Sequence, residues 1–517
     1  MTMRGKIFFG LLSVLILGCK GNDKPNEEKQ DLRHSYVEQY RPQFHFTPEE
    51  KWMNDPNGLV YHEGIYHLFY QYYPEDIVWG PMHWGHATSK DLVHWEHQPI
   101  ALYPDEHGLI FSGSAVVDTN NTSGFAKNGE TPLVAVFTYH SMEGEKAGRM
   151  DFQTQGIAYS LDNGETWTKY DGNPVIGNSG IKDFRDPKVF WDEGSQKWVL
   201  VLVAGDHAKF YGSDNLKDWN LLSEFGREQG AHGGVWECPD LFPLQVDGSD
   251  ETKWVLIISM NPGAPNGGSG TQYFVGNFDG KTFTSEQMEP KWLDFGTDNY
   301  AGVTYNNTPN GERIFIGWMS NWDYARDTPT QKWRSAMTVP RKLALKKREG
   351  YYLLANYPIP EVDGLATSIL MEGFTVGAHQ TESRRIEGLN QSSLQLTSGS
   401  KDFSIALKNK LGETVVMSMD SKKNQFALDR RNSGQVDFQE VFGNKIHVAP
   451  THLLEGDSVE VKILVDQSSI EIFVNGGLLT MTEQLFPNAP FDTLIIENKD
   501  QKTEIEVSNV KKMESVW

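Results

Sequence analysis

The chain has 517 residues, of which 38% are hydrophobic, 12% aromatic and 22% charged. This apolar content excludes a wholly disordered chain, and the length corresponds to two or three domains. The 47 basic and 69 acidic residues give a net charge of −22, which argues against nucleic acid and carboxylate-rich partners and leaves neutral small molecules or sugars. Only two cysteines occur, Cys19 and Cys238, so neither a disulfide scaffold nor a Cys-based zinc site fits.

Residues 1–19 have the pattern of a secretory signal peptide. Arg4 and Lys6 give a basic start, and the apolar run of 12 residues that follows is too short to span a membrane. The run ends in the letters ILGC, which resemble a bacterial lipobox and predict lipidation of Cys19. A plain secretory signal with an incidental cysteine is the alternative.

The polar stretch 20–35 lacks periodicity and is expected to be a flexible tether. This tether and the predicted lipid on Cys19 together predict an exported bacterial lipoprotein. Its contact with the membrane, at the periplasmic face or the cell surface, would be through the lipid anchor alone.

From residue 36 onward, short aromatic and β-branched runs alternate with Gly, Asn, Asp and Pro turns, which predicts an all-β chain. A turn containing Asp or Asn and closed by an aromatic residue recurs, ending at Trp95, Trp167, Trp219 and Phe283. The spacings of 72, 52 and 64 residues, with about four strands per unit, are typical of propeller blades. With 300–345 as the last unit, we predict a five-bladed β-propeller over residues 36–342; a set of unrelated hairpins is the alternative.

The composition changes after residue 342. Residues 343–365, with two prolines near their end, are expected to be a linker. Of the 15 tryptophans, only Trp517 lies beyond residue 333, and alternating strands such as 459–465 and 469–474 predict a β-sandwich over residues 366–517. The expected fold is therefore an N-terminal five-bladed β-propeller followed by a C-terminal β-sandwich.

Three acidic motifs lie at the predicted first strands of different blades: WMNDPNG with Asp55, FRDP with Asp186 and WECPD with Glu237. Because the first strand of each blade lines the central channel, these carboxylates are expected to converge at one mouth. Paired carboxylates are the groups that cleave glycosidic bonds. A purely structural role for three such turns is the alternative.

The neighbours of these carboxylates suggest different roles. Nearby like charges and aromatic rings would raise the pKa of Glu237 and suit it to act as the acid, whereas Arg185 would keep Asp186 ionised. Cys238 is expected to be a small packing residue. No calcium-loop spacing occurs, so no metal and no cofactor is expected. Aromatic residues near the motifs can stack on sugar rings: Trp52, Trp79, Trp84, Phe111, Trp236 and Trp318.

The motifs WMNDPNG, FSGS, FRDP and WECPD, in this order, resemble glycoside hydrolase family 32, the group of invertases, inulinases and levanases. The resemblance runs from about Tyr40 to the C-terminus and implies a five-bladed propeller followed by a β-sandwich. It implies a retaining mechanism in which Asp55 is the nucleophile, Glu237 the general acid/base and Asp186 the transition-state stabiliser. The expected substrate-binding residues are Trp52, Met53, Asn54, Gln71, Trp79, Phe111, Ser112, Arg185 and Trp318.

The letters DNY at 298–300 depart from the more usual Asp-Phe-Tyr of the family, which leaves the role of Tyr300 open. Segments 78–86 and 103–106 look closest to bacterial levanases and exo-inulinases. The expected activity is release of fructose from levan or inulin, and from sucrose as a smaller substrate. An endo-acting fructanase is an alternative.

Two further readings compete with a fructoside hydrolase. A sialidase would need several arginines around the sugar carboxylate, and only Arg185 lies in a channel motif. A non-catalytic, surface-anchored glycan-binding lipoprotein would have lost a catalytic carboxylate, and all three are present. Independent sugar binding by the sandwich is a weaker possibility.

Overall fold

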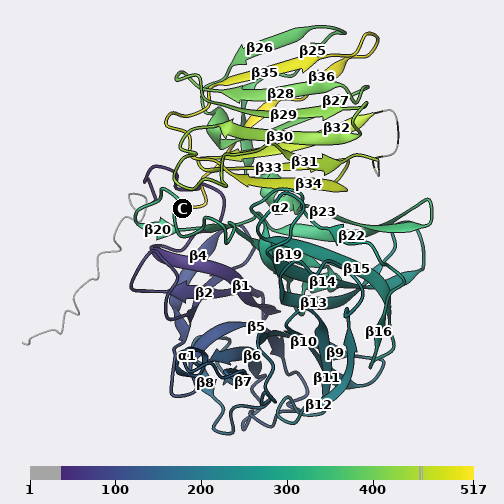
Figure 1. Ribbon diagram of the computed structural model, residues 1–517. Coiled ribbons are helices and arrows are strands. Elements are labelled where there is room, and N and C mark those ends of the chain that lie inside the picture. The colour runs from purple at the N-terminus through teal and green to yellow at the C-terminus, as the bar shows by residue number, and fades with distance from the viewer. Residues whose placement is uncertain (1–35, 453, 455, 457) are drawn as a thin grey trace, which may run out of the picture.

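The computed structural model describes residues 36–452, 454, 456 and 458–517, so the predicted signal peptide, tether and lipidated Cys19 lie outside the described residues. Five sheets form a propeller, and two further sheets form a sandwich on one side of it (Figure 1). The expected all-β fold, a five-bladed propeller followed by a β-sandwich, is confirmed. Within the described residues, no helix has the length and apolar character needed to cross a membrane.

The first three blades are antiparallel sheets whose strands follow chain order. The first contains β1 (Lys51–His62), β2 (Ile65–Tyr73), β3 (His83–Ser89) and β4 (Trp95–Leu102). The second contains β5 (Leu109–Val117), β6 (Leu133–His140), β7 (Gln153–Ser160) and β8 (Thr168–Lys169), with the short helix α1 (Met142–Lys146) after β6. The third contains β9 (Phe184–Asp192), β10 (Lys197–Ala204), β11 (Ala208–Ser213) and β12 (Asn220–Phe225).

The last two blades complete the ring. The fourth contains β13 (Val235–Gln245), β14 (Thr252–Asn261), β15 (Gly270–Phe278), β16 (Phe283–Thr284) and β17 (Lys291–Trp292). The fifth contains β18 (Tyr300–Thr304), β19 (Ile314–Met319), β21 (Ala336–Met337), β22 (Arg341–Arg348) and β23 (Tyr351–Pro358), with the 3-10 turn η2 (Pro309–Gly311) after β18. The strand β20 (Trp333–Arg334) pairs in parallel with β1 and so joins the end of the propeller to its beginning.

The linker expected at 343–365 is wrong for most of its length, because β22 and β23 are the outer strands of the fifth blade. Leu343 and Leu345 are buried, whereas Lys342 before them and the charged residues 346–348 after them are more exposed. This alternation belongs to a half-buried outer strand, and its many charges gave the segment the composition of a connector. The short helix α2 (Pro360–Gly364) then leads to the sandwich.

The repeated sequence motif forms one kind of hairpin turn, between the third and fourth strands of a blade. The indole N–H groups of Trp95, Trp167 and Trp219 each donate to the backbone carbonyl three residues earlier, at 2.9, 3.2 and 3.0 Å. Towards the axis, the innermost strands β1, β5, β9, β13 and β18 contact one another in turn and close a ring.

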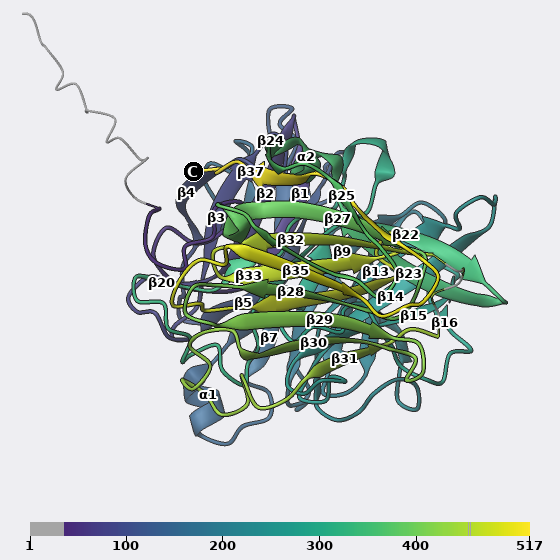
Figure 2. The same ribbon diagram turned by 90° about the horizontal axis from the view of Figure 1, so that it is seen from above.

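The sandwich packs two antiparallel sheets around a core of Leu, Ile, Val, Met and Phe side chains. One sheet contains β24 (Ala366–Met371), β25 (Phe374–Val376), β27 (Ser392–Ser398), β32 (Val459–Asp466), β33 (Ser469–Val474), β34 (Leu479–Gln484), β36 (Ile505–Val507) and β37 (Val510–Met513). The other contains β26 (Thr381–Arg385), β28 (Phe403–Lys408), β29 (Thr414–Asp420), β30 (Gln425–Asn432), β31 (His447–Pro450) and β35 (Thr493–Asn498). A 3-10 turn, η3 (Leu389–Gln391), precedes β27. Seen from above, these strands lie over the propeller (Figure 2).

Buried charged side chains join the propeller to the sandwich. Arg341 of the fifth blade pairs with Asp294 at 3.0 Å and with Glu471 of the sandwich at 3.1 Å. Arg430 of the sandwich pairs in turn with Asp298 at 2.7 Å. We call the whole set the interdomain ion network; its members are His45, Asp294, Asp298, Arg341, Arg430, His447, Asp466, Glu471 and Glu483.

Candidate active site

All five innermost strands are irregular near their first residues, at the same end of the channel. The irregularities are register shifts in the pairing of β1 at 53–56, β5 at 110–113, β9 opposite 201–203, β13 at 237–240 and β18 at 300–303. Three of the strands also contain a left-handed residue there, Asp186, Cys238 and Ala301, with φ of 63°, 46° and 53°. Bulges of this kind re-aim side chains at the rim of a barrel or propeller.

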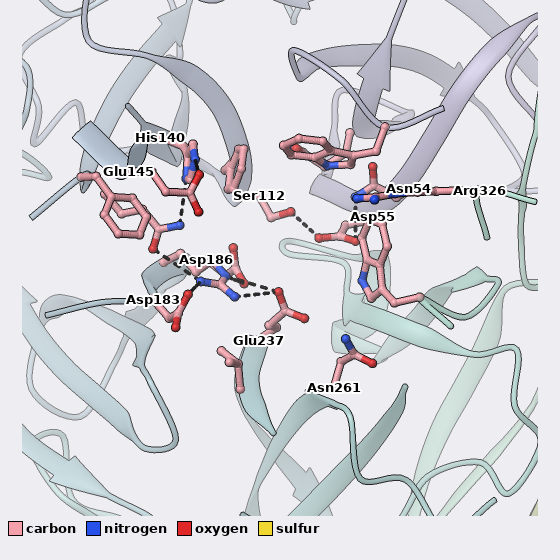
Figure 3. Close-up of a pocket in the computed structure, with 18 residues that line it drawn as sticks. Asn54, Asp55, Ser112, His140, Glu145, Asp183, Asp186, Glu237, Asn261 and Arg326 are labelled. Atoms are coloured by element: carbon pink, nitrogen blue, oxygen red, sulfur yellow. Dashed lines mark hydrogen bonds and ion pairs between the residues drawn. The ribbon is translucent and has the colours of Figure 1, made fainter. Parts of the chain in front are cut away.

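These irregular strand starts surround a cavity of about 450 Å³. Asp55, Asp186 and Glu237, which come from three different blades, all line it (Figure 3). The sequence-based expectation that these carboxylates share one mouth therefore describes the observed geometry.

Asp55 is held by short polar contacts on both carboxylate oxygens. The Ser112 hydroxyl donates to Oδ2 at 2.6 Å, and the Asn54 side-chain amide donates to Oδ1 at 3.0 Å. Burial raises the pKa of Asp55, the charge of Glu237 raises it further, and these two hydrogen bonds only partly oppose the shift. Asp55 is thus fixed in position but is less acidic than an exposed aspartate.

Asp186 lies deeper, and its Oδ2 accepts the backbone N–H of Cys238 at 3.0 Å. Burial raises the pKa of Asp186 to about 7, against the opposing effect of Arg185. The expectation that Arg185 keeps Asp186 ionised is therefore not met. The reason is geometric, because Arg185 Nε is 3.8 Å from Asp186, while Arg185 pairs more closely with other carboxylates.

Arg185 is the link between the cavity wall and Glu237. Its guanidinium contacts Glu237 Oε1 at 3.0 Å and Asp183 Oδ1 at 2.7 Å. The second oxygen of Glu237 accepts the hydroxyl of Tyr300. Glu237 is therefore oriented from two sides, and Tyr300 contacts it directly despite the unusual motif at 298–300.

Cys238 lies between two of the carboxylates and has more than a packing contact with them. Its Sγ is 3.5 Å from Asp55 Oδ2 and 3.7 Å from Asp186 Oδ2. Burial, and then the negative charges of Asp186 and Asp55, raise the pKa of this thiol well above its ordinary value. It therefore stays a neutral donor, which excludes a nucleophilic thiolate.

The expected substrate-binding residues fall into two groups. Six of them line the cavity: Asn54, Gln71, Trp79, Phe111, Ser112 and Arg185. Trp52, Met53 and Trp318 are instead fully buried behind the wall. Trp52 supports the wall because its indole N–H donates to Asn54 Oδ1 at 2.7 Å, and so it positions the neighbour of Asp55.

Sequence reasoning also assigned sugar stacking to Trp84 and Trp236, and both side chains are fully buried. Their rings pack between blades, so they are not available to a sugar. The large aromatic content of the propeller thus serves its core as much as its surface.

Several cavity residues carry no sequence motif and were missed: His140, Glu145, Phe152, Gln153, Asp183, Val235, Asn261, Trp322 and Arg326. Some belong to a connected group in which His140 stacks on Phe111 with ring centroids 4.2 Å apart and contacts Glu145 at 3.1 Å. Gln153 continues the group by contacting His140 Nδ1 at 3.1 Å and accepting the Phe184 backbone N–H at 2.8 Å. Their positions depend on how the β6–β7 connection folds over the mouth, which no local pattern predicts.

Two family models match the chain. The model described as "Glycosyl hydrolases family 32 N-terminal domain" matches residues 45–357, and "Glycosyl hydrolases family 32 C terminal" matches residues 372–514. The first match ends at the last strand of the fifth blade. Together the two models account for the propeller and the sandwich.

Characterised proteins resemble the chain over most of its length. A levanase of Bacillus subtilis strain 168 is 46% identical over 493 residues, which cover 93% of this chain and 72% of the levanase. An extracellular exo-inulinase of Aspergillus niger is 44% identical over 493 residues, which cover 88% of this chain and 91% of the exo-inulinase.

Solved structures agree with these sequence relatives. The crystal structure of exo-inulinase from Aspergillus awamori has a TM-score of 0.85 and 40% identity, and the match covers 93% of this chain and 100% of that one. A fructofuranosidase from Schwanniomyces occidentalis in complex with fructose has a TM-score of 0.82 and 32% identity, and the match covers 93% and 99%.

Proposed function

Because the chain belongs to glycosyl hydrolase family 32, we propose that it hydrolyses the β-fructofuranosidic bonds of levan or inulin, and of sucrose as a smaller substrate. It is a glycosidase of the β-fructofuranosidase type. One observation carries the proposal: Asp55, Asp186 and Glu237 come from three different blades and line one cavity. Each of these carboxylates is held in place by hydrogen bonds.

In the proposed first step, a carboxylate oxygen of Asp55 attacks C2 of the terminal fructosyl unit. The bond from C2 to the leaving oxygen breaks, and protonated Glu237 gives its proton to that oxygen. The result is a fructosyl ester on Asp55. The hydrogen bonds from Ser112 and Asn54 support this role because they fix both oxygens of Asp55.

In the second step, a water attacks C2 of the ester, Glu237 takes the proton from that water, and the bond from C2 to Asp55 breaks. Each of the two steps inverts the configuration at C2, so the product retains the β configuration. Asp186 would accept hydrogen bonds from fructose hydroxyls, and its burial among the cavity residues supports this binding role. The contacts of Arg185 and Tyr300 support the role of Glu237 by orienting it.

Cleavage at the chain end is the favoured mode of action. The cavity of about 450 Å³ is at the lower end of the size range of ligand pockets, which suits one terminal unit better than the middle of a polymer. Tryptophan and phenylalanine at its wall, Trp79 and Phe111, meet edge to face with centroids 6.1 Å apart and offer an apolar face to the ring.

Products resolved over time from levan, inulin and sucrose test both points. Free fructose as the first product from a fructan supports the proposal. Oligofructosides ahead of fructose would show endo cleavage, and no release from any of the three substrates would contradict the proposed activity.

We further propose that the protein is exported, as the extracellular exo-inulinases among its relatives are by name. Lipidation at Cys19 lies outside the described residues and stays a prediction from the sequence. Replacing Cys19→Ala and following the protein between membrane and soluble fractions tests it, because loss of the anchor would move the protein into the soluble fraction.

A further inference from the structure

A second cavity lies at the opposite end of the propeller from the active site. Strands β9 and β13 begin beside Asp186 and Glu237 and end near Asp192 and Pro243, which line a cavity of about 740 Å³. Six residues of extended strand separate Asp186 from Asp192, so the two cavities are about 20 Å apart. We call this the far-mouth cavity.

Partly exposed aromatic rings gather at the far-mouth cavity from two neighbouring blades. Phe190 and Trp191 come from the end of β9, and Trp254 and Phe278 from β14 and β15. Ring centroids are 5.6 Å apart between Phe190 and Trp254 and 5.0 Å apart between Trp254 and Phe278. Apolar ring faces that border solvent in this way match the apolar faces of sugar rings.

Arg313 supplies an unused polar group at the same cavity. Its guanidinium lies over the Phe242 ring, 5.5 Å from the ring centroid, and its Nε has no hydrogen-bond acceptor among the described residues. Arg313 also lines the cavity, where the guanidinium N–H groups other than Nε can donate to a bound acceptor. Ligand hydroxyl groups are acceptors of this kind.

Negative charges around the far-mouth cavity favour a neutral ligand over an anionic one. Glu193 and Asp279 are exposed at its rim, and the whole chain carries a net charge of −22. A polyanion would be repelled from this face, whereas a neutral sugar both accepts from Arg313 and donates to the acidic rim.

We propose that the far-mouth cavity binds a segment of neutral β-fructan chain without cleaving it. Sugar rings stack on Trp191 and Trp254, and Arg313 donates to a ring hydroxyl. Holding the polymer at a second point raises its effective concentration at the active site. The choice of polymer rests on the proposed function, whereas the existence of a second sugar site does not.

Affinity electrophoresis in native gels that contain levan or inulin tests this site. The Asp55→Ala protein is used as the parent so that the polymer is not hydrolysed during the run, and fructose is added to fill the active site. The parent should be retarded by the polymer. Adding Trp191→Ala and Trp254→Ala should weaken the retardation about tenfold, as expected for the loss of two stacking faces.

Trp219→Ala is the matched control, because Trp219, in the β11–β12 turn, is also partly exposed but does not line the cavity. It should leave the retardation unchanged. With Asp55 restored, the double tryptophan variant should hydrolyse sucrose within about twofold of the unmodified protein, which shows that its fold is intact. Arg313→Gln is a second variant with a smaller change in volume and should also weaken the retardation.

An unretarded parent, or retardation that survives both the double variant and Arg313→Gln, would overturn the proposal. Equal retardation by dextran would overturn the assignment to fructan. If the unmodified protein failed to hydrolyse levan and inulin but the variants still lost retardation, the proposed function would fail while the second site would stand.

Discussion

The candidate active site and the interdomain ion network both bury several carboxylates beside arginine, and the pKa values of Asp55 and Glu471 shift in opposite directions. In the network, burial acts to raise the pKa of Glu471, but Arg341 and His45 outweigh it and lower that pKa. In the active site, burial raises the pKa of Asp55 and the charge of Glu237 adds to the shift. The two pKa shifts differ because the network has several cationic side chains, whereas at the mouth Arg185 is shared among several carboxylates.

The protein therefore compensates buried negative charge between its two domains and leaves part of it uncompensated at the mouth. The network pairs nearly every acid and so holds the two domains together. The mouth contains more buried carboxylates than its arginine can neutralise, which costs stability. These carboxylates remain free to accept protons from a substrate or donate protons to it. Five substitutions test this difference between the two regions.

Asp55→Ala and Glu237→Gln should have the largest effects. Each removes a group that acts on the reacting atoms, so kcat for sucrose and levan should fall at least about 10³-fold. Thermal unfolding should show no loss of stability, because neither group belongs to the interdomain ion network and the buried carboxylates of the mouth cost stability. Near-full activity of either variant would contradict the assigned role.

Arg341→Met should destabilise the protein most. It leaves Asp294 buried without its cation and Glu471 with His45 alone, and breaking a buried pair in this way costs about 3–5 kcal/mol. Lys342→Met is the matched control, because Lys342 pairs with Glu312 at the surface. Denaturant unfolding compares the two, and a loss below about 1 kcal/mol for Arg341→Met would refute the importance of the network.

Asp186→Asn should separate stability from activity. The pKa of Asp186 rises from about 3.9 unfolded to about 7 folded, so ionisation disfavours the folded state progressively as pH rises through this range. The variant escapes this cost and should gain stability on the order of 1 kcal/mol at pH 8 but little at pH 4.5, while losing activity. Melting temperatures at the two pH values measure this, and an equal difference at both would contradict it.

Cys238→Ala should have the smallest effect. It removes a thiol donor that lowers the pKa of Asp55, so the acidic limb of the kcat/KM profile should move to higher pH. Cys238→Ser, which keeps a donor, should move the limb back. Identical profiles for all three proteins would show that the thiol does not act on Asp55.

Local sequence patterns predicted most strands of the propeller because hairpin turns depend on short-range signals, and the blade repeat predicted that Asp55, Asp186 and Glu237 share one cavity. The turn that ends in Trp95, Trp167 or Trp219 is stabilised within seven or eight residues and is therefore visible in the sequence. The burial of Trp52 and Trp318 was not visible, because these two rings come from distant segments and lie against each other, with centroids 6.3 Å apart.

The outer strands of the fifth blade and the partners of Arg185 were missed for related reasons. A charged outer strand such as β22 has the composition of a connector, and only its neighbours in the sheet reveal it. Arg185 follows Asp183 and precedes Asp186 in the chain, yet it reaches Glu237, which is 52 residues away in sequence. Such pairings are set by the closure of the ring.

The stereochemistry of fructosyl transfer to methanol is the sharpest test of the double-displacement mechanism through Asp55. If a fructosyl ester forms on Asp55 and is released with help from Glu237, hydrolysis of sucrose in aqueous methanol must produce methyl β-fructofuranoside alongside fructose. Nuclear magnetic resonance of the products assigns the anomer. The β anomer is the predicted result, and the α anomer would show a single displacement and contradict Asp55 as the nucleophile.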